Sequence, residues 1–587
     1  MTLDATETEI LGATALDAPW ALVEAFSHIV REHPDEVNRA GNLIAELLRA
    51  HGVPVTVHEP TLYLSLPKHA EVGVAGLVLR AKPPSFARSC PDGVEGRLVM
   101  VTAPSARPPG FAAASASLFG EGYDPTPGLS DVAGCVAAYH GLLNAERISQ
   151  LEELGAIAVI AINPGRDIHW GAANPVWGTP GLDGLPSRPR IPSVAISHDD
   201  AAFLEAQAGQ ACRVVTVLEE GWFKSVLPVV TIPGNVELDR FVLLHGHYDS
   251  WDVGVGDNAT GDAAMLEIAR VLWQHRAELR RSVRIAWWPG HSTGKFAGST
   301  WYCDQYAHEL MAGCVAQLNC DSPGVRGAVA YDNIPAMAET IALVSQAVHD
   351  VTGVAATAKR PSQSSDYSFN NIGISGLFSS SSRLPKAELE RRGFYYVMGN
   401  GGDTSWHTER DTLDVADPDV LLTDIKVYLL AVLRLANTAV LPLDWRPLVA
   451  EMAGAISGYQ RDAGERFDFS PAATAAAGLS DRLSRLYGAM GQSMSDAAAN
   501  AILLRLARIL VPLNYALTTT YRHDPGVPTI TLPMLSVARS LDRYPANVLG
   551  FAQAHLLRGM NHVVAGFNDA TACINAALDQ APRITAS

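Results

Sequence analysis

Apolar positions along the chain follow two different periods, and the change from one to the other divides the chain into regions. Apolar residues recur every three to four positions over residues 38–49, 260–273 and 500–511, which predicts amphipathic helices. Short apolar runs over residues 241–247 and 282–288 predict buried strands. Strands that alternate with helices in this way are typical of an α/β sheet.

Four regions follow from this pattern. Residues 1–59 hold amphipathic helices and then an alternating stretch that predicts an edge strand. Residues 60–234 contain short apolar strands, many prolines and glycines and little helix. Strands and helices alternate over residues 235–444, and residues 445–587 are mainly helical. The chain of 587 residues is too long for one hydrophobic core, so two to four domains are expected.

Charge and composition limit the possible partners. The formal net charge of −17 argues against nucleic acid, because phosphate binding requires clustered lysine and arginine. No apolar run reaches membrane-spanning length, and the N-terminus lacks the features of a signal peptide. Seven scattered cysteines without a Cys-x-x-Cys pair suit a reducing compartment. We therefore expect a cytoplasmic protein without a membrane or nucleic-acid partner.

Polar side chains stand where the predicted strands of the third region end. One strand ends in His247, with Asp249 two residues later and Asp257 in a glycine-rich loop before the next helix. A later strand leads into Asp321, and His407 follows a second glycine-rich loop. Ligands bind at the carboxyl ends of strands in open α/β sheets, so these residues are candidate metal ligands. The alternative is that they cap a strand and a helix.

Four short motifs carry a resemblance to a known family. They are His247-Tyr-Asp249, Gly256-Asp257-Asn258 with Gly261, Asn319-Cys-Asp321 and His407-Thr-Glu-Arg-Asp411-Thr. In order and spacing they resemble the M28 family of co-catalytic zinc peptidases. The resemblance implies that Asp257 bridges two ions. It further implies that His247 and Asp321 bind one ion and His407 the other, with Asp249 orienting the imidazole of His247.

The chain departs from the family at one position. After the strand over residues 284–288 the family has a pair of glutamates, a general base and a ligand of the second zinc, whereas this chain has His291-Ser292. Three interpretations follow. His291 replaces the lost ligand, or it is the general base and the second metal is weak or absent, or the site is a remnant retained for binding.

Two further residues are candidates for substrate binding. Asp366 lies in a stretch that resembles the Ser-Asp segment of the family, where it is expected to orient the substrate or His407, or else to cap a helix. Tyr396 lies on the approach to His407, where its hydroxyl would stabilise an oxyanion unless the ring packs in the core. The segment 167–177, rich in histidine and tryptophan, is either a roof over the site or a solvent loop.

The resemblance extends to the other regions. Residues 60–234 resemble a protease-associated domain, and residues 445–587 resemble the dimerisation domain of the glutamate carboxypeptidase and transferrin receptor branch. The expected fold is therefore α/β: an M28-like mixed sheet flanked by helices, with a β-rich insert and a C-terminal helical domain. The same resemblance implies a homodimer.

The expected function is hydrolysis of an amide or peptide bond in a small substrate by a metal-activated water. One or two zinc ions per protomer are expected, with manganese or another divalent metal possible. Two alternatives remain open. The first is a mononuclear hydrolase or lyase-like enzyme that acts on a non-peptide metabolite. The second is a catalytically inactive, transferrin-receptor-like binding protein.

Overall fold

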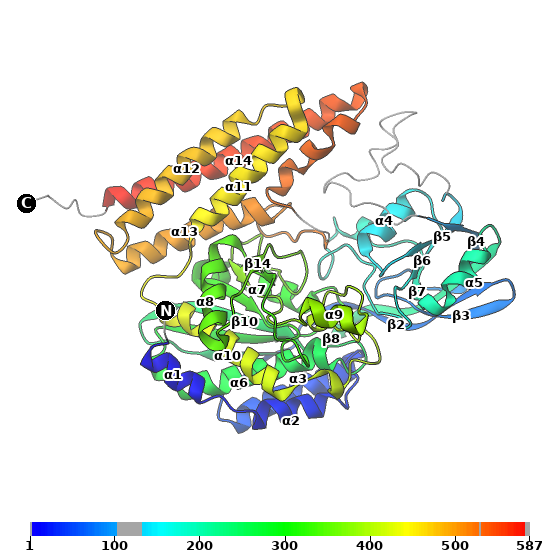
Figure 1. The fold of residues 1–587 in the computed structure, drawn as a ribbon, viewed down its shortest axis with the longest axis horizontal. Helices are drawn as coiled ribbons and strands as arrows, with labels where there is room; N and C mark the ends of the chain where they lie inside the picture. The colour runs from blue at the N-terminus through cyan, green and yellow to red at the C-terminus, as the bar shows by residue number, and fades with distance from the viewer. Residues whose placement is uncertain (1–2, 102–131, 527–529, 581–587) are drawn as a thin grey trace, which may run out of the picture.

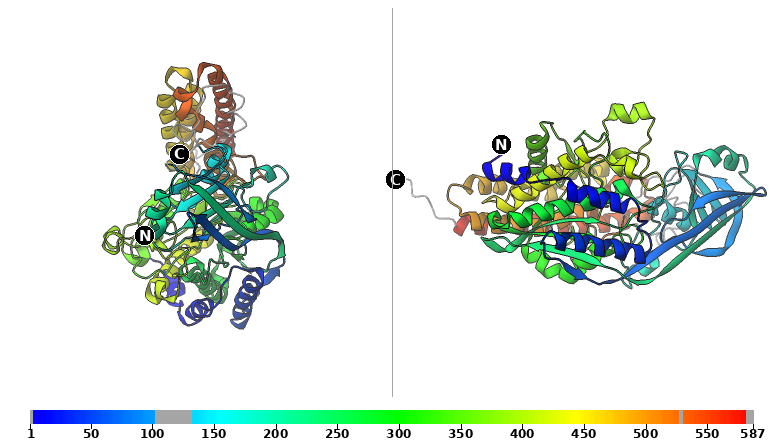
Figure 2. Two further views of the ribbon diagram at one scale, coloured as in Figure 1. Left: turned by 90° about the vertical axis from the view of Figure 1, so that its right-hand side faces the viewer. Right: turned by 90° about the horizontal axis from the view of Figure 1, so that it is seen from below.

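The computed structural model describes residues 3–101, 132–526 and 530–580. These residues form an α/β core, a β-barrel and a C-terminal helical bundle (Figure 1). The barrel lies at one end of the core, the bundle covers one side, and the N-terminal helices lie on the opposite side (Figures 1 and 2). Within the described ranges, none of the helices is both long and apolar enough to cross a membrane.

A six-stranded mixed sheet forms the centre of the core, in the order β1-β9-β11-β10-β12-β15. Its strands are β1 (Thr56–His58), β9 (Leu227–Ile232), β10 (Glu237–His247), β11 (Arg281–Trp288), β12 (Cys314–Asn319) and β15 (Gly376–Leu377). β10 pairs in parallel with β11 and β12, so the carboxyl ends of these three strands meet at one edge. A short pair, β13 (Ile334–Pro335) and β14 (Ala358–Lys359), lies outside this sheet.

Helices cover both faces of the central sheet. They are α1 (Ala5–Gly12), α2 (Asp17–Phe26), α3 (Pro34–Ala50), α6 (Thr260–Gln274), α7 (Ala297–Gly313), α8 (Ile341–Thr352) and α10 (Pro418–Asn437). A further short helix, α9 (Lys386–Arg392), has no buried residue. Alternate residues of β10 point to opposite faces. Val242 and Leu244 share a core cluster with α6 and α10, whereas Phe241 and Leu243 share one with α7. The continuous apolar run of β10 is thus explained by burial on both faces.

The β-rich region forms a closed barrel in the order β2-β3-β7-β6-β5-β4-β8. Its strands are β2 (Thr61–Val74), β3 (Leu77–Lys82), β4 (Cys90–Met100), β5 (Cys135–His140), β6 (Ala158–Ile162), β7 (Ser193–Ile196) and β8 (Ala211–Lys224), with helices α4 (Ala145–Glu153) and α5 (Ala201–Ala206). The barrel ends at Lys224. β9 lies inside the range predicted for the insert, but it pairs with β1 and β11 of the central sheet.

Four long helices form the C-terminal bundle: α11 (Trp445–Ala463), α12 (Ser470–Ala489), α13 (Asp496–Tyr515) and α14 (Ala546–Gln580). Each buries an apolar stripe against the others, as Leu479, Leu483 and Leu486 of α12 do. The helix predicted over residues 500–511 is longer at both ends in α13, which continues through Pro512 to Tyr515. Proline removes only one backbone donor there, in the last turn of the helix.

Candidate metal centre

Three acidic and imidazole side chains meet at the carboxyl edge of the central sheet. His247 is the last residue of β10, Asp321 follows β12, and Asp257 lies in the loop before α6. His247 Nε2 lies 3.0 Å from Asp257 Oδ1 and 3.9 Å from Asp321 Oδ2. One ligand atom from each of the three residues lies within 4.8 Å of the other two. The parallel register of β10 and β12 accounts for this convergence.

His407 faces the same carboxylate from the other side. Its Nε2 lies 3.1 Å from Asp257 Oδ2, whereas His247 lies next to Oδ1. Each oxygen of Asp257 therefore has its own imidazole. The structure thus brings together all four residues that the sequence proposed as ligands.

The residues present fit a divalent cation. His247 Nε2 and Asp257 Oδ1 are buried and have no hydrogen-bond partner among the described residues. Although burial opposes ionisation, the two neighbouring imidazoles hold the pKa of Asp257 well below its usual range. Burial and the charge of Asp257 raise the pKa of Asp321. Buried imidazole and carboxylate groups with free lone pairs are the donor set that zinc prefers.

Asp249 has a different role from the one expected. His247 Nδ1 donates to the main-chain carbonyl of Asp249 at 2.9 Å, whereas the carboxylate oxygen lies 3.9 Å away. The carboxylate instead accepts the main-chain N–H groups of His291 and Ser292, at 2.9 and 2.8 Å. Asp249 therefore orients His247 with its backbone and holds the His291 loop with its side chain.

His291 forms a buried pair with Asp366. Its Nδ1 lies 2.7 Å from Asp366 Oδ2, and its ring stacks on His247 with centroids 3.7 Å apart. The other oxygen of Asp366 accepts the hydroxyl of Ser299 at 2.6 Å. Because a carboxylate only accepts, Nδ1 carries the proton and the lone pair of His291 is on Nε2. Asp366, expected to orient the substrate or His407, is therefore the partner of His291.

A segment of the barrel region holds His407 in place. His407 Nδ1 donates to the carbonyl of Trp170 at 3.0 Å, and the N–H of Trp170 donates to the carbonyl of His407 at 2.9 Å. His169 lies beside this pair, 2.7 Å from both the carbonyl of Trp406 and the hydroxyl of Tyr395. We call His169, Trp170 and Tyr395 the His407 clamp. Burial lowers the pKa of His169 to about 4, so it is neutral and bridges the two groups.

Sequence reasoning missed the clamp and chose the neighbouring tyrosine. Tyr396 is 75% exposed, whereas Tyr395 makes the hydrogen bond to His169. Segment 167–177 was a candidate for the roof of the site, and His169 and Trp170 belong to it. The high content of histidine and tryptophan in this segment was the sequence feature that could have pointed to the clamp.

Two other residues fix the loop that carries Asp257. The carboxylate of Asp411 accepts the N–H groups of Gly256 and Asp257 at 2.7 and 3.0 Å, and burial raises its pKa to about 7. The Asn258 amide donates to the carbonyls of His247 and Cys320 at 3.0 and 2.9 Å. Asn258 thereby joins the ends of β10 and β12 to this loop.

Comparison with known proteins gives a family match for the core. Residues 229–431 match the model of Peptidase family M28. The chain is 29% identical over 235 residues to a probable glutamate carboxypeptidase VP8 of Zea mays, an alignment that covers 38% of this chain and 32% of that protein. It is 29% identical over 121 residues to carboxypeptidase Q of Xenopus laevis, covering 19% of this chain and 26% of that protein. The chain thus spans about a third or less of the length of these relatives.

Solved structures share the fold over more of the chain. An aminopeptidase from Aneurinibacillus sp. strain AM-1 superposes with a TM-score of 0.54 at 18% identity, covering 73% of this chain and 96% of that one. BSAP, a zinc aminopeptidase from Bacillus subtilis, gives a TM-score of 0.53 at 19% identity and covers 72% and 96% of the two chains. At this level of identity the similarities show a shared fold over about three quarters of this chain.

Proposed function

We propose that the protein is a metal-dependent hydrolase of an amide or peptide bond in a small substrate, because residues 229–431 match the model of Peptidase family M28. One observation carries the proposal. Asp257 presents its two oxygens to His247 and His407 at 3.0 and 3.1 Å, at the carboxyl edge of a parallel sheet. A carboxylate between two imidazoles is the geometry of a bridging ligand.

We propose zinc as the metal, with His247, Asp257 and Asp321 holding the first ion. A bound divalent ion supplies a Lewis acid that polarises the scissile carbonyl and makes water more acidic. Asp257 and His407 are the residues placed for a second ion. These two side chains are fewer than the three that hold the first ion, so a second ion has the weaker donor set, and this favours one tightly held ion per protomer.

His291 is proposed as the general base in place of the missing glutamate. Its Nδ1–H donates to Asp366, so Nε2 accepts the proton of the attacking water, and the buried carboxylate stabilises the imidazolium that forms. Stacking on His247 keeps this nitrogen beside the metal centre. Of the three interpretations of His291, the geometry supports this one best.

The roofed site supports a small substrate. His247, His291 and His407 have side chains that are 1%, 14% and 15% exposed, and segment 167–177 lies against His407. A folded polypeptide would not reach these atoms, whereas a short peptide or an amide-bearing metabolite would. A protease-associated role for the barrel, a homodimer formed through the C-terminal bundle and a cytoplasmic location remain part of the proposal. The free cysteines of the described residues support a reducing compartment.

Metal content and activity, measured together, test the proposal. Elemental analysis of wild type, His291→Ala and His407→Ala is combined with hydrolysis of a panel of aminoacyl, dipeptide and N-acyl amide substrates. The proposal expects bound metal in the wild type, unchanged metal but lost hydrolysis in His291→Ala, and less metal in His407→Ala if a second ion is bound.

Other results select the alternatives. Loss of one ion in His291→Ala would make His291 a ligand. One bound ion with activity only on non-peptide amides would indicate the mononuclear enzyme. A wild type that binds no metal after reconstitution would contradict hydrolysis and leave a binding protein.

A further inference from the structure

A large cavity lies away from the metal centre, where three parts of the fold meet. It has a volume of about 1260 Å³ and is lined by segment 175–190 of the barrel region, by α7 and by residues 518–525 next to the bundle. Ligand sites commonly hold about 300–1,000 Å³, so this cavity accommodates a small molecule. The candidate metal ligands are not among its described lining residues.

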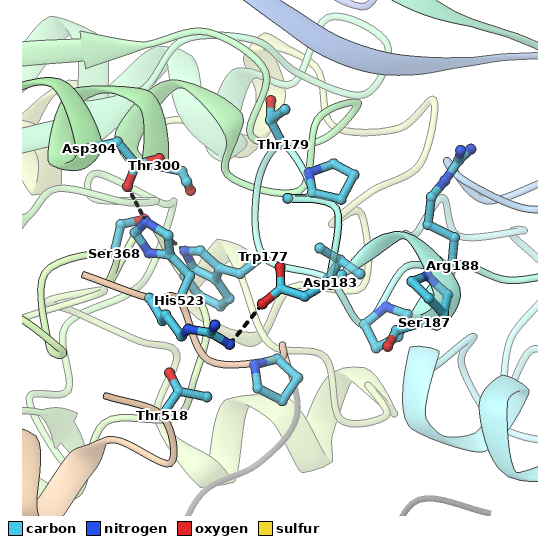
Figure 3. Close-up of a pocket in the computed structure, with 18 of the residues that line it drawn as sticks. Trp177, Thr179, Asp183, Ser187, Arg188, Thr300, Asp304, Ser368, Thr518 and His523 are labelled. Carbon is cyan, nitrogen blue, oxygen red and sulfur yellow. Dashed lines mark hydrogen bonds and ion pairs between the residues drawn. The ribbon is translucent and has the colours of Figure 1, made fainter. Parts of the chain in front are cut away.

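Trp177 forms the inner wall of the cavity (Figure 3). The residue is 3% exposed, and its indole N–H donates to the hydroxyl of Ser368 at 2.7 Å. Its ring stacks on Phe296 with centroids 4.0 Å apart, and Phe296 meets the edge of His291 at 4.6 Å. The Trp177 and Phe296 rings therefore separate the cavity from the metal centre.

The arginines and the His523 imidazole of the lining are each paired with a carboxylate. Arg522 lies 2.7 Å from Asp183, and His523 lies 2.7 Å from Asp304 (Figure 3). Both pairs tie the 518–525 segment to an opposite wall. Arg188 pairs with Glu220 and Arg190 pairs with Glu152. An anionic ligand therefore meets no unpaired arginine among the described lining residues.

Aromatic side chains dominate the surface that is left. Trp222 and Tyr521 line the cavity although they are 63% and 55% exposed, and they come from β8 and from segment 518–525. Two large aromatic rings kept in solvent in one cavity lining are a feature of ligand-binding surfaces. Hydroxyl groups of Thr179, Thr300 and Thr518 supply uncharged hydrogen-bonding partners.

We propose that this cavity is a second binding site, separate from the metal centre, for an uncharged aromatic small molecule. The rings of Trp222 and Tyr521 receive the ligand at the opening and Trp177 forms the end wall. Specificity for an uncharged ligand follows from the paired charges. Neither candidate metal cluster of the described residues contributes to the lining.

Fluorescence titration of the full-length protein tests the proposal. The probe is N-phenyl-1-naphthylamine, an uncharged aromatic amine, and 8-anilinonaphthalene-1-sulfonate is the anionic comparison with the same ring system. We expect saturable binding of the uncharged probe with one site per protomer, at least tenfold tighter than that of the anionic probe.

Two variants place a charge in the cavity from different walls: Ala307→Glu on α7 and Ser187→Glu in the barrel region. Each is expected to weaken binding of the uncharged probe at least tenfold. Gln305→Glu is the matched control, since it adds the same charge to the same helix outside the lining and is expected to bind as the wild type does. Unsaturable binding, equal binding of the two probes, or binding unchanged in both cavity variants would overturn the proposal. None of these readouts depends on hydrolysis.

Discussion

His407 is a strained residue at a functional position. Its φ of 58° is in the left-handed region, which a non-glycine side chain rarely adopts. The clamp described above compensates, because Trp170 bonds both the imidazole and the carbonyl of His407. The orientation of this imidazole thus depends on residues outside the M28 motifs.

Loosening the clamp should weaken metal binding. His169→Ala removes the hydrogen bond to the carbonyl of Trp406, and Tyr395→Phe removes the hydrogen bond that holds His169 itself. Loss of such a supporting contact typically costs about 10- to 100-fold in metal affinity. Chelator competition would measure the dissociation constant for zinc. Tyr396→Phe, at an exposed neighbouring position, is the control and should bind zinc as the wild type does. Equal affinities in all four proteins would show that the clamp does not position a ligand.

Asp366 should act on catalysis without acting on metal content. In Asp366→Asn the imidazole of His291 loses its anionic partner, so both the tautomer and the imidazolium are less well stabilised. We expect kcat to fall by about 100-fold or more, with unchanged zinc by elemental analysis. If zinc is lost together with activity, His291 and Asp366 support the metal and not the proton transfer.

Glu339 gives the protein a pH-dependent stability remote from the site. The residue is 1% exposed, and burial raises its pKa from 4.5 to about 7. Between these values the folded chain binds more protons than the unfolded chain, so this group lowers the free energy of unfolding as pH rises.

Glu339→Gln should remove this pH dependence. Relative to wild type, the variant should gain about 3 kcal/mol in unfolding free energy between pH 4.5 and pH 8, because it cannot ionise. Urea unfolding at several pH values would measure the difference. Glu390→Gln on the exposed face of α9 should show no such trend, and parallel curves for Glu339→Gln and wild type would contradict the assignment.

At the scale of elements, α6 packs unusually close to the end of β12. A Cβ on Gly261, in the first turn of α6, would lie 2.2 Å from Asn258 Oδ1 and 2.5 Å from the carbonyl of Cys320. Alanine normally favours a helix over glycine, so this glycine is required by the close approach and not by the helix.

The substitution of two helical glycines separates these effects. Gly261→Ala should destabilise the fold by about 1–3 kcal/mol, since backbone at β12 must move. Gly454→Ala on α11, where nothing lies within 4 Å, should instead stabilise by about 0.5–1 kcal/mol. Thermal or urea unfolding of both variants measures the sign, and a stabilising Gly261→Ala would refute the packing argument.

Elements with strong local patterns were predictable. The apolar runs of β10, β11 and β12 gave their strands, and the polar residues that end them gave His247, Asp257 and Asp321. His291 and Asp366 are 75 positions apart in the sequence. Both lie in irregular segments, where no hydrophobic periodicity indicates which way a side chain points. The hydrogen bond of Tyr395 to His169 was not predictable for the same reason, and the role of Tyr396 in substrate binding stays a prediction.

At the scale of the whole molecule, the sequence indicated the kind of secondary structure in each region but not which regions contact one another. Short strands with glycine and proline predicted the β-rich unit, whereas the pairing of β9 with β1 and β11 depends on tertiary packing. The contact between segment 167–177 and His407 likewise joins two regions of the fold. Local patterns contain no information about such contacts.

Metal removal should lower the stability of the whole chain. The centre joins β10, the residue after β12 and the loop of His407, so bound zinc favours the folded state. At a free metal concentration about 100 times the dissociation constant, the gain is about 2.7 kcal/mol. Calorimetry with and without a chelator measures it. Asp257→Asn should show no chelator effect, and an equal effect in this variant would place the stabilising metal elsewhere.

The His407 clamp also determines when the metal centre is completed during synthesis of the chain. Trp170 and His407 are separated by 237 residues, so a ribosome makes the barrel part of the clamp, His169 and Trp170, long before His407. Until the 407 loop has been synthesised and has docked on the barrel, no contact with Trp170 stabilises the left-handed backbone conformation of His407. Completion of the candidate metal centre is therefore a late event in biogenesis, and it requires that the 407 loop has docked on the barrel.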